Sequence, residues 1–323
     1  MYKIGLVYNK PRDINPEEKE LDPRSYRQSE IIANHIEEAL VSKGHKVTMI
    51  PASLNLLQDI EAAGDLDVIF NSCTGINNKK EQANIVGMLE LLDIPIVGSS
   101  LQTHVTALHK GITKTILEKE GIPVTPFQIF KDPDEPLDGD LNFPLFVKPE
   151  SEGSAVGITM DSLVNNEEEL KERVKFVVDS FNQPALVEGY LSGREFSVAV
   201  IGTKNPKTLP ITELKFPEDL EENIQSVDVK AENVIERVCP ADISPELEKE
   251  ISDIVIASFK ALNCTEYVRV DVKLDENNKP HIIELNSLPA LEPGYAHFPV
   301  MAEAGGYTMA DLVETLVKEA LSA

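Results

Sequence analysis

Short, mostly apolar runs recur along the first hundred residues of the chain. Runs typical of buried β-strands occur at residues 3–8, 46–50, 67–71 and 94–98. Apolar residues three and four positions apart predict a helix from Ser25 to Gly44 and another over residues 81–92. Strands that alternate with helices favour an open parallel sheet with helices on both faces. We therefore expect an α/β unit at the start of the chain.

Strand and helix patterns continue through the rest of the sequence. Strands are predicted at residues 143–149, 184–190, 195–202, 267–274 and 281–285. Helices are predicted at residues 106–120, 166–181, 244–262 and 308–320. Two polar segments without clear periodicity, 9–23 and 216–237, are predicted to be loops, and the second is long enough to act as a lid.

The last two predicted strands flank residues 275–280, which are almost all turn formers and therefore predict a β-hairpin. Asp271 lies on its first strand, and Glu284 and Asn286 lie near the end of the second. Alternate side chains share a face, so three oxygen donors converge beside Arg269 and suit Mg²⁺ bound to phosphate. A solvated hairpin face is the alternative, but charges inside strands of Val, Ile and Leu need partners.

A loop of small residues follows the strand that carries Lys148, and residues after it are expected to resume as a strand. Backbone N–H groups of such a loop can approach phosphate oxygens, to which the lysine adds a positive charge. The loop is not a P-loop, and the first strand is not followed by G-x-G-x-x-G, which disfavours a dinucleotide-binding dehydrogenase. Taken alone, the loop also fits an ordinary hairpin turn.

Composition narrows the class of protein and its partners. A chain of 323 residues predicts two or three domains, and no apolar segment is long enough for a membrane span. The net charge of −25 disfavours nucleic acid and anionic membrane surfaces as partners. Three widely spaced cysteines and an N-terminus without a signal-peptide pattern favour a soluble, cytoplasmic protein without a disulfide framework.

Six segments, in order, resemble the ATP-grasp superfamily and, within it, the D-alanine–D-alanine ligases. They read EQANIVGMLELLDIPIVGSS, FPLFVKPESEGSAVGI, LVEGYLSGREFSVAVIG, CPADISPELEKEISDIVIASFKALNC, VRVDVKLD and IIELNSLP. The resemblance implies a three-domain architecture of mixed α/β and α+β type. It comprises a Rossmann-like N-terminal domain at 1–103, a small central domain at 104–184 with a flap at 150–158, and a C-terminal domain at 185–323 that holds the metal site.

The same resemblance implies roles for individual residues. The residues implied to bind ATP are Lys110, Lys148, Ser151, Gly153, Ser154, Glu188, Gly189, Tyr190, Leu191 and Glu195. Asp271, Glu284 and Asn286 match the ligands of two Mg²⁺ ions, for which Mn²⁺ is a substitute. Arg269, Lys148 and Ser154 match residues that act in catalysis.

The activity implied is an ADP-forming ligation of a carboxylate to an amine through an acyl phosphate, with amino acids or similar small molecules as substrates. A cell-wall role and a homodimer follow from the same resemblance. The substrate half departs from the family pattern, with no tyrosine between residues 216 and 266 and a longer segment after Asn286. Candidate substrate residues are Glu81, Glu292, Gly294, Tyr295 and His297. A ligase with a different dipeptide or amide product and a non-catalytic ATP-binding module are the alternatives.

Overall fold

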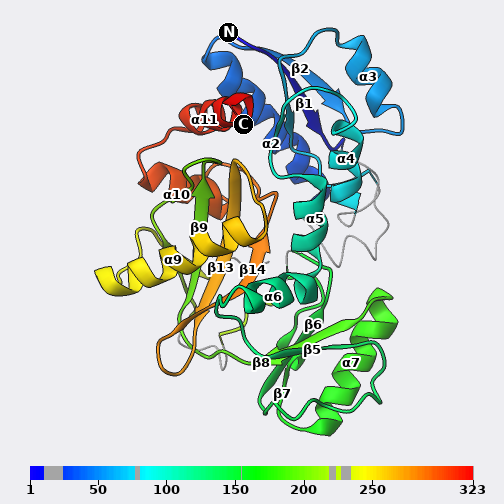
Figure 1. Cartoon of the computed structure of the whole chain (residues 1–323), viewed down its shortest axis with the longest axis vertical. Coiled ribbons are helices and arrows are strands. Elements are labelled where there is room, and N and C mark those ends of the chain that lie inside the picture. The colour runs from blue at the N-terminus through cyan, green and yellow to red at the C-terminus, as the bar shows by residue number, and fades with distance from the viewer. Residues whose placement is uncertain (11–24, 77–80, 154, 218–222, 227–233, 323) are drawn as a thin grey trace.

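The computed structural model describes residues 1–10, 25–76, 81–153, 155–217, 223–226 and 234–322. Three sheets form the framework of the chain (Figure 1). Residues 11–23 of the predicted loop at 9–23, and residues 218–222 and 227–233 of the predicted lid at 216–237, fall outside the described residues. Within the described part of the chain, no helix is both long and apolar enough to cross a membrane.

The predicted N-terminal parallel sheet is confirmed. Its strands are β1 (Lys3–Tyr8), β2 (Lys46–Pro51), β3 (Val68–Asn71) and β4 (Ile96–Val97), in the order β2-β1-β3-β4. Its helices are α2 (Ser25–Ser42), α3 (Leu56–Ala62) and α4 (Gln82–Leu89). Side chains of β1 alternate between two cores, since Ile4 and Leu6 pack in the core that contains α2, whereas Val7 packs with α3 and α4.

A second, antiparallel sheet follows in the chain. Its strands are β5 (Phe127–Phe130), β6 (Leu145–Pro149), β7 (Leu163–Val164) and β8 (Ala185–Gly189), in the order β5-β8-β6-β7. Helix α7 (Glu167–Phe181) covers it, and Leu170, Val174 and Val177 bury the apolar face of the helix against the sheet. Asn166 caps this helix by accepting a hydrogen bond from the backbone N–H of Glu169, as the sequence predicts.

The third sheet carries the predicted hairpin. It contains β9 (Glu195–Ile201), β11 (Thr212–Lys215), β12 (Glu236–Val238), β13 (Tyr267–Leu274) and β14 (Pro280–Asn286), in the order β12-β11-β9-β13-β14, with β10 (Lys207–Thr208) beside β9. On β13, Val268, Val270 and Val272 pack in one core with α9 (Pro245–Ala261). The residues between them, Arg269 and Asp271, therefore face the opposite side of the sheet.

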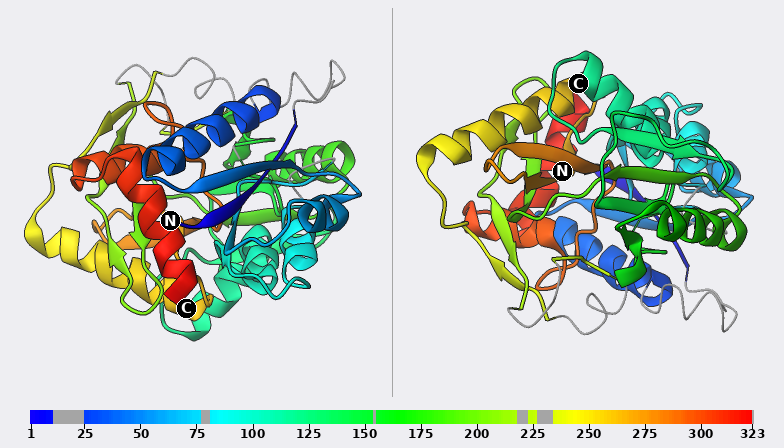
Figure 2. Two further views of the ribbon diagram at one scale, coloured as in Figure 1. Left: turned by 90° about the horizontal axis from the view of Figure 1, so that it is seen from above. Right: turned by 90° about the horizontal axis from the view of Figure 1, so that it is seen from below.

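The chain ends beside its beginning. Helices α10 (His297–Ala304) and α11 (Met309–Ser322) share a hydrophobic core with β1, β3 and α2. Figure 2 shows α11 and α2 side by side, and an ion pair of 2.5 Å joins Lys43 Nζ to Asp311 Oδ1. The C-terminal helix is thus part of the N-terminal core.

Several predicted elements differ from the structure. The predicted helix at 106–120 is two helices, α5 (Leu101–Leu108) and α6 (Lys110–Lys119), separated by the extended backbone of His109. Residues after the flap form a 3₁₀ turn at Met160–Ser162 and only then the two-residue strand β7. Helices α3 and α10 and strands β5, β10, β11 and β12 are not predicted, because short elements carry little periodicity. The proposed domain boundary at 103/104 falls inside α5.

The hydrophobic core that α11 shares with the N-terminal sheet can be tested by its contribution to stability. Leu316 of α11 is fully buried in that core, whereas Leu54 is 87% exposed. We expect Leu316→Ala to lower the free energy of unfolding by about 2–5 kcal/mol, because it leaves a cavity between the two ends of the chain. Leu54→Ala is the matched control, with an expected effect below about 0.5 kcal/mol in urea unfolding followed by circular dichroism. Equal losses for the two variants would contradict this arrangement.

Candidate active site

The β13–β14 hairpin gathers the predicted metal ligands on one face. In its antiparallel register Asp271 pairs with Glu284, and Arg269 pairs with Asn286. Directly paired residues point to the same side of a sheet, so these four side chains lie together. A β-bulge in β14 leaves Ile283 without a register partner, and Ile283 and Glu284 both line the adjacent cavity.

Asp271 is the centre of a buried polar cluster. Its Oδ1 accepts hydrogen bonds from Arg269 Nε at 3.0 Å and from Ser197 Oγ at 2.8 Å. Its Oδ2 accepts hydrogen bonds from the Arg269 guanidinium at 2.8 Å and from Asn286 Nδ2 at 3.1 Å. Burial raises the pKa of Asp271, but the adjacent guanidinium outweighs burial and holds this pKa below its ordinary value. The carboxylate is therefore ionised and oriented.

Lys110 connects this edge to the flap. It is the first residue of α6, and its ammonium lies 3.6 Å from Glu284 Oε1. The same ammonium donates a hydrogen bond to the backbone carbonyl of Glu152. A single buried cation thus contacts both the strand that carries the predicted metal ligands and the predicted phosphate-binding loop.

Lys148 belongs to a second buried cluster. Glu188 on β8 lies between two lysines, with Lys148 Nζ 2.6 Å from Oε1 and Lys114 Nζ 2.8 Å from Oε2. Thr125 donates a hydrogen bond to Glu188 Oε2 at 3.2 Å and accepts one from Lys114 at 2.9 Å. Burial raises the pKa of Glu188, but the two ammonium groups outweigh burial and lower this pKa to about 2.

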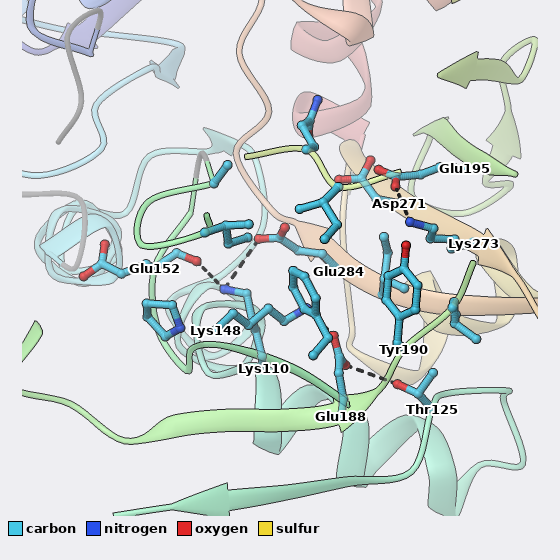
Figure 3. A pocket seen from close by; sticks show the side chains of 18 of the residues that line it. Lys110, Thr125, Lys148, Glu152, Glu188, Tyr190, Glu195, Asp271, Lys273 and Glu284 are labelled. Carbon is cyan, nitrogen blue, oxygen red and sulfur yellow. Dashed lines mark hydrogen bonds and ion pairs between the residues drawn. The ribbon is translucent and has the colours of Figure 1, made fainter. Parts of the chain in front are cut away.

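Glu195, the predicted ribose ligand, pairs with Lys273 of β13 at 3.4 Å. Burial, followed by the nearby Asp271 carboxylate, raises the pKa of Glu195 above its ordinary value. The Lys273 ammonium also lies 5.5 Å from the centre of the Tyr190 ring and donates a hydrogen bond of 2.7 Å to the Asn223 carbonyl. This pair closes the end of the site opposite Lys110 (Figure 3).

These groups surround one cavity of about 880 Å³, a volume that includes the part open to solvent (Figure 3). The predicted site residues that line it are Lys110, Lys148, Gly153, Glu188, Gly189, Tyr190, Leu191, Glu195, Asp271 and Glu284. Phe146, Val156 and Ile224 add apolar walls. Its apolar walls and converging charges suit a small organic ligand that carries several negative charges.

Three predicted residues lie elsewhere. Arg269 and Asn286 contact Asp271 but do not line the cavity. The backbone N–H and the hydroxyl of Ser151 both donate to the Gln183 side-chain oxygen, at 2.7 and 2.9 Å, so this hydroxyl is engaged away from the cavity. Ser154 lies outside the described residues.

The five candidate substrate residues are not part of the cavity lining in the described part of the chain. Glu81 precedes α4 and accepts a hydrogen bond of 3.1 Å from the backbone N–H of Ile76. Glu292 is half-buried, and Gly294 has a left-handed backbone with φ of +73°. Arg237 donates a hydrogen bond to the Tyr295 carbonyl, and the charge of His297, which begins α10, helps to lower the pKa of Asp271.

Four further side chains in the site were not predicted. Lys273 lies two positions after Asp271 on the same strand, and Lys114 lies one helical turn after Lys110, so their spacing was an available signal. Ser197 contacts Asp271 only because β9 pairs with β13, and Thr125 lies in a connecting segment. No local sequence pattern indicates these two residues.

The donor set fits a hard cation. In the part of the chain that the structure describes, there is no group of three or more His, Cys, Asp or Glu side chains placed to hold a metal ion. The predicted set consists instead of two carboxylates and one amide, and their oxygen atoms are the donors that Mg²⁺ prefers.

The Glu188 cluster makes a prediction about stability. We expect Glu188→Gln to lower the free energy of unfolding at neutral pH by about 3–5 kcal/mol, because it leaves two buried ammonium groups without an anionic partner. Asp179→Asn is the control, since the Lys175–Asp179 ion pair is more than half exposed on both sides. Its expected cost in denaturant unfolding is below about 1 kcal/mol.

The pH dependence provides a second measurement on the same variant. The pKa of Glu188 falls from 4.5 to about 2 on folding, so its stabilising contribution is complete above pH 4.5 and is lost as the pH falls towards 2. The difference in unfolding free energy between the wild type and E188Q should shrink over that window. If that difference stayed constant between pH 4.5 and about 2, Glu188 would not be the ionised partner of the two lysines.

Comparison with known proteins agrees with this geometry. Residues 116–318 match the family model described as D-ala D-ala ligase C-terminus. The protein y4sG of Sinorhizobium fredii is 31% identical over 88% of this chain and 86% of its own length. The D-alanine–D-alanine ligase of Carboxydothermus hydrogenoformans is 30% identical over 86% of this chain and 89% of its own length.

Solved structures share the fold. The ATP complex of D-alanine–D-alanine ligase from Bacillus anthracis has a TM-score of 0.77 at 22% identity, and the match covers 100% of this chain and 98% of that one. The VanG D-Ala:D-Ser ligase of Enterococcus faecalis has a TM-score of 0.77 at 19% identity, with 99% of each chain covered. The chain belongs to the D-alanine–D-alanine ligase family of ATP-grasp enzymes, which join a carboxylate to an amine with conversion of ATP to ADP.

Proposed function

We propose that this protein joins the carboxylate of one small amino acid to the amine of a second through an acyl phosphate, with D-alanine as the first substrate to test. One observation carries the proposal. Asp271, Glu284, Lys110 and Lys148 line the same cavity, and the Lys110 ammonium lies beside Glu284. The names of the relatives, D-alanine–D-alanine ligase and D-Ala:D-Ser ligase, support two small amino acids as the substrates.

ATP is proposed to occupy this cavity. Lys110 and Lys148 would contact the phosphates, and each is held beside a carboxylate in the structure without nucleotide. Backbone groups at residues 188–191 would bind the adenine edge, and Glu195 would bind the ribose hydroxyls. The flap residues Ser151, Gly153 and Ser154 would cover the triphosphate, a role that for Ser151 and Ser154 rests on the resemblance alone.

Asp271, Glu284 and Asn286 are proposed to hold two Mg²⁺ ions, or Mn²⁺ in their place. The metal ions would neutralise negative charge on the phosphate oxygens during transfer to the acid. Arg269 would then stabilise the oxyanion that forms when the amine attacks. Its double contact with Asp271 fixes the guanidinium plane before either substrate arrives.

Other parts of the proposal concern the organisation of the protein. We propose three domains, at 1–103, 104–184 and 185–323, and a cytoplasmic homodimer. The amino acids are proposed to contact Glu81, Glu292, Gly294, Tyr295 and His297, a role that rests on the resemblance alone. A carboxylate at Glu292 would disfavour a second substrate whose own carboxylate approached it.

Glu284 provides a direct test of the metal site. We expect Glu284→Gln to reduce both the turnover number and the affinity for Mn²⁺ by at least ~10–100-fold. Loss of a residue that only supports a metal ligand already has an effect of this size. Glu276→Gln is the matched control, because Glu276 is exposed in the turn of the same hairpin. Mn²⁺ binding is measured by electron paramagnetic resonance with a non-hydrolysable ATP analogue. Turnover of E284Q close to that of E276Q would remove Glu284 from the mechanism.

ADP release tests the reaction itself. We expect ATP consumption to require a carboxylate and an amine together, with D-alanine pairs assayed against D-alanine plus D-serine and against L-amino acid pairs. Mass spectrometry of the product should show loss of one water between the two substrates. Tight ATP binding without ADP release for every pair would favour the non-catalytic ATP-binding module instead.

A further inference from the structure

Three polar side chains from distant parts of the sequence meet beside the candidate active site. They come from α4, α5 and the residue that follows β14. His104 Nδ1 lies 2.6 Å from Gln82 Nε2 and 2.7 Å from Ser287 Oγ. Gln82 Nε2 also donates a hydrogen bond of 3.3 Å to Ser287 Oγ. His104 and Ser287 are 2% and 4% exposed, whereas Gln82 is half-buried.

Hydrogen-bond chemistry fixes the state of the imidazole. An amide nitrogen only donates, so Nδ1 of His104 must be the acceptor and the ring must carry its hydrogen on Nε2. A hydrogen bond with the backbone of Ser99 occupies the ring as well. Burial keeps the ring neutral and lowers its pKa to about 4. Ser287 is therefore held by an acceptor with a defined direction.

The location of the cluster gives it a role. Ser287 directly follows Asn286, whose amide donates to Asp271. Gln82 directly follows Glu81, the candidate substrate residue at the start of α4. His104 thus joins the residue next to a proposed metal ligand to the residue next to a proposed substrate contact.

Helix α5 is a rigid support for this contact. The hydroxyl of Thr103 donates to the carbonyls of Leu262 and Asn263, at 3.0 and 2.9 Å, and anchors α5 to the segment that leads into β13. His104, the next residue, reaches the end of β14. One helix therefore contacts both the segment before β13 and the residue after β14, the two strands that carry the proposed metal ligands.

We propose that His104 is a positioning residue that sets the direction of Asn286 and the distance between the metal-binding edge of β14 and the start of α4. This inference rests on the proposed function and adds to it a residue outside the cavity. Loss of the imidazole acceptor would leave the buried Ser287 hydroxyl without an acceptor, and Gln82 Nε2 would keep only Ser287 Oγ as its partner in the cluster. Asn286 would then lose its fixed orientation, and metal affinity would fall.

The test compares three variants by a measurement that does not depend on turnover. His104→Leu keeps the volume and removes the acceptor, whereas His104→Asn keeps an acceptor close to the position of Nδ1. Ser258→Ala is the matched control, because it removes a buried hydroxyl whose hydrogen bond lies within α9. Mn²⁺ binding is measured by electron paramagnetic resonance in the presence of a non-hydrolysable ATP analogue, and stability is measured by urea unfolding.

We expect H104L to weaken Mn²⁺ binding by about 10–100-fold, the range found when a residue that orients a metal ligand is lost. H104N should recover most of that loss. S258A should lower the urea midpoint but leave Mn²⁺ affinity near that of the wild type. If H104L does not fold, Ser287→Ala, which removes the hydroxyl alone, carries the same comparison and should weaken Mn²⁺ binding in the same direction.

Two results would overturn the inference, and they are distinguishable. Equal Mn²⁺ affinities for H104L and S258A, with a wild type that binds Mn²⁺ and releases ADP, would show that His104 acts on stability alone. A wild type that binds no Mn²⁺ with the nucleotide analogue would overturn the metal site itself, and the role of His104 with it.

Discussion

The alternation of side chains along β13 is the constraint on which the rest of the structure depends. Every second residue, from Val268 to Leu274, enters the apolar core beneath α9. The residues between them, Arg269, Asp271 and Lys273, are thereby fixed on the other face, where water is scarce and charges need partners. A shift of register by one residue would exchange these two sets, so the core that stabilises the strand also orients its chemistry.

Charged groups in and beside the cavity are paired with one another. Lys148 lies against Glu188, Lys110 against Glu284, Lys273 against Glu195, and Arg269 against Asp271. A triphosphate bound here, as proposed, would have to exchange these ion pairs for new ones. The strength of each pair sets how much of the attraction to phosphate remains as binding free energy. Pairing also holds the lysines extended towards the cavity, which reduces the entropy lost when the ligand binds.

Much of this arrangement was predictable from the sequence. The hairpin, its three oxygen donors and the lysine before the flap carry local signals, namely alternation, turn formers and a run of small residues. The sequence does not show which side chains from distant segments contact one another. The resemblance implies an adenine-binding role for Glu188, and the sequence does not indicate that its carboxylate lies between Lys114 of α6 and Lys148 of β6. Ser197 and Thr125 likewise enter the site through strand pairing and a connecting segment. The break at His109 was missed because both helices keep a regular apolar spacing.

The packing of α11 against α2 has a consequence for how the chain acquires its structure. Residues near 4 and 40 complete their hydrophobic core with residues near 312 and 317. Contacts between residues so far apart in sequence are slow to form, because the two segments must first meet at the entropic cost of closing the long loop between them. During synthesis, the first sheet emerges long before the helix that seals one of its faces. That exposed face has to remain in solution until α11 has left the ribosome.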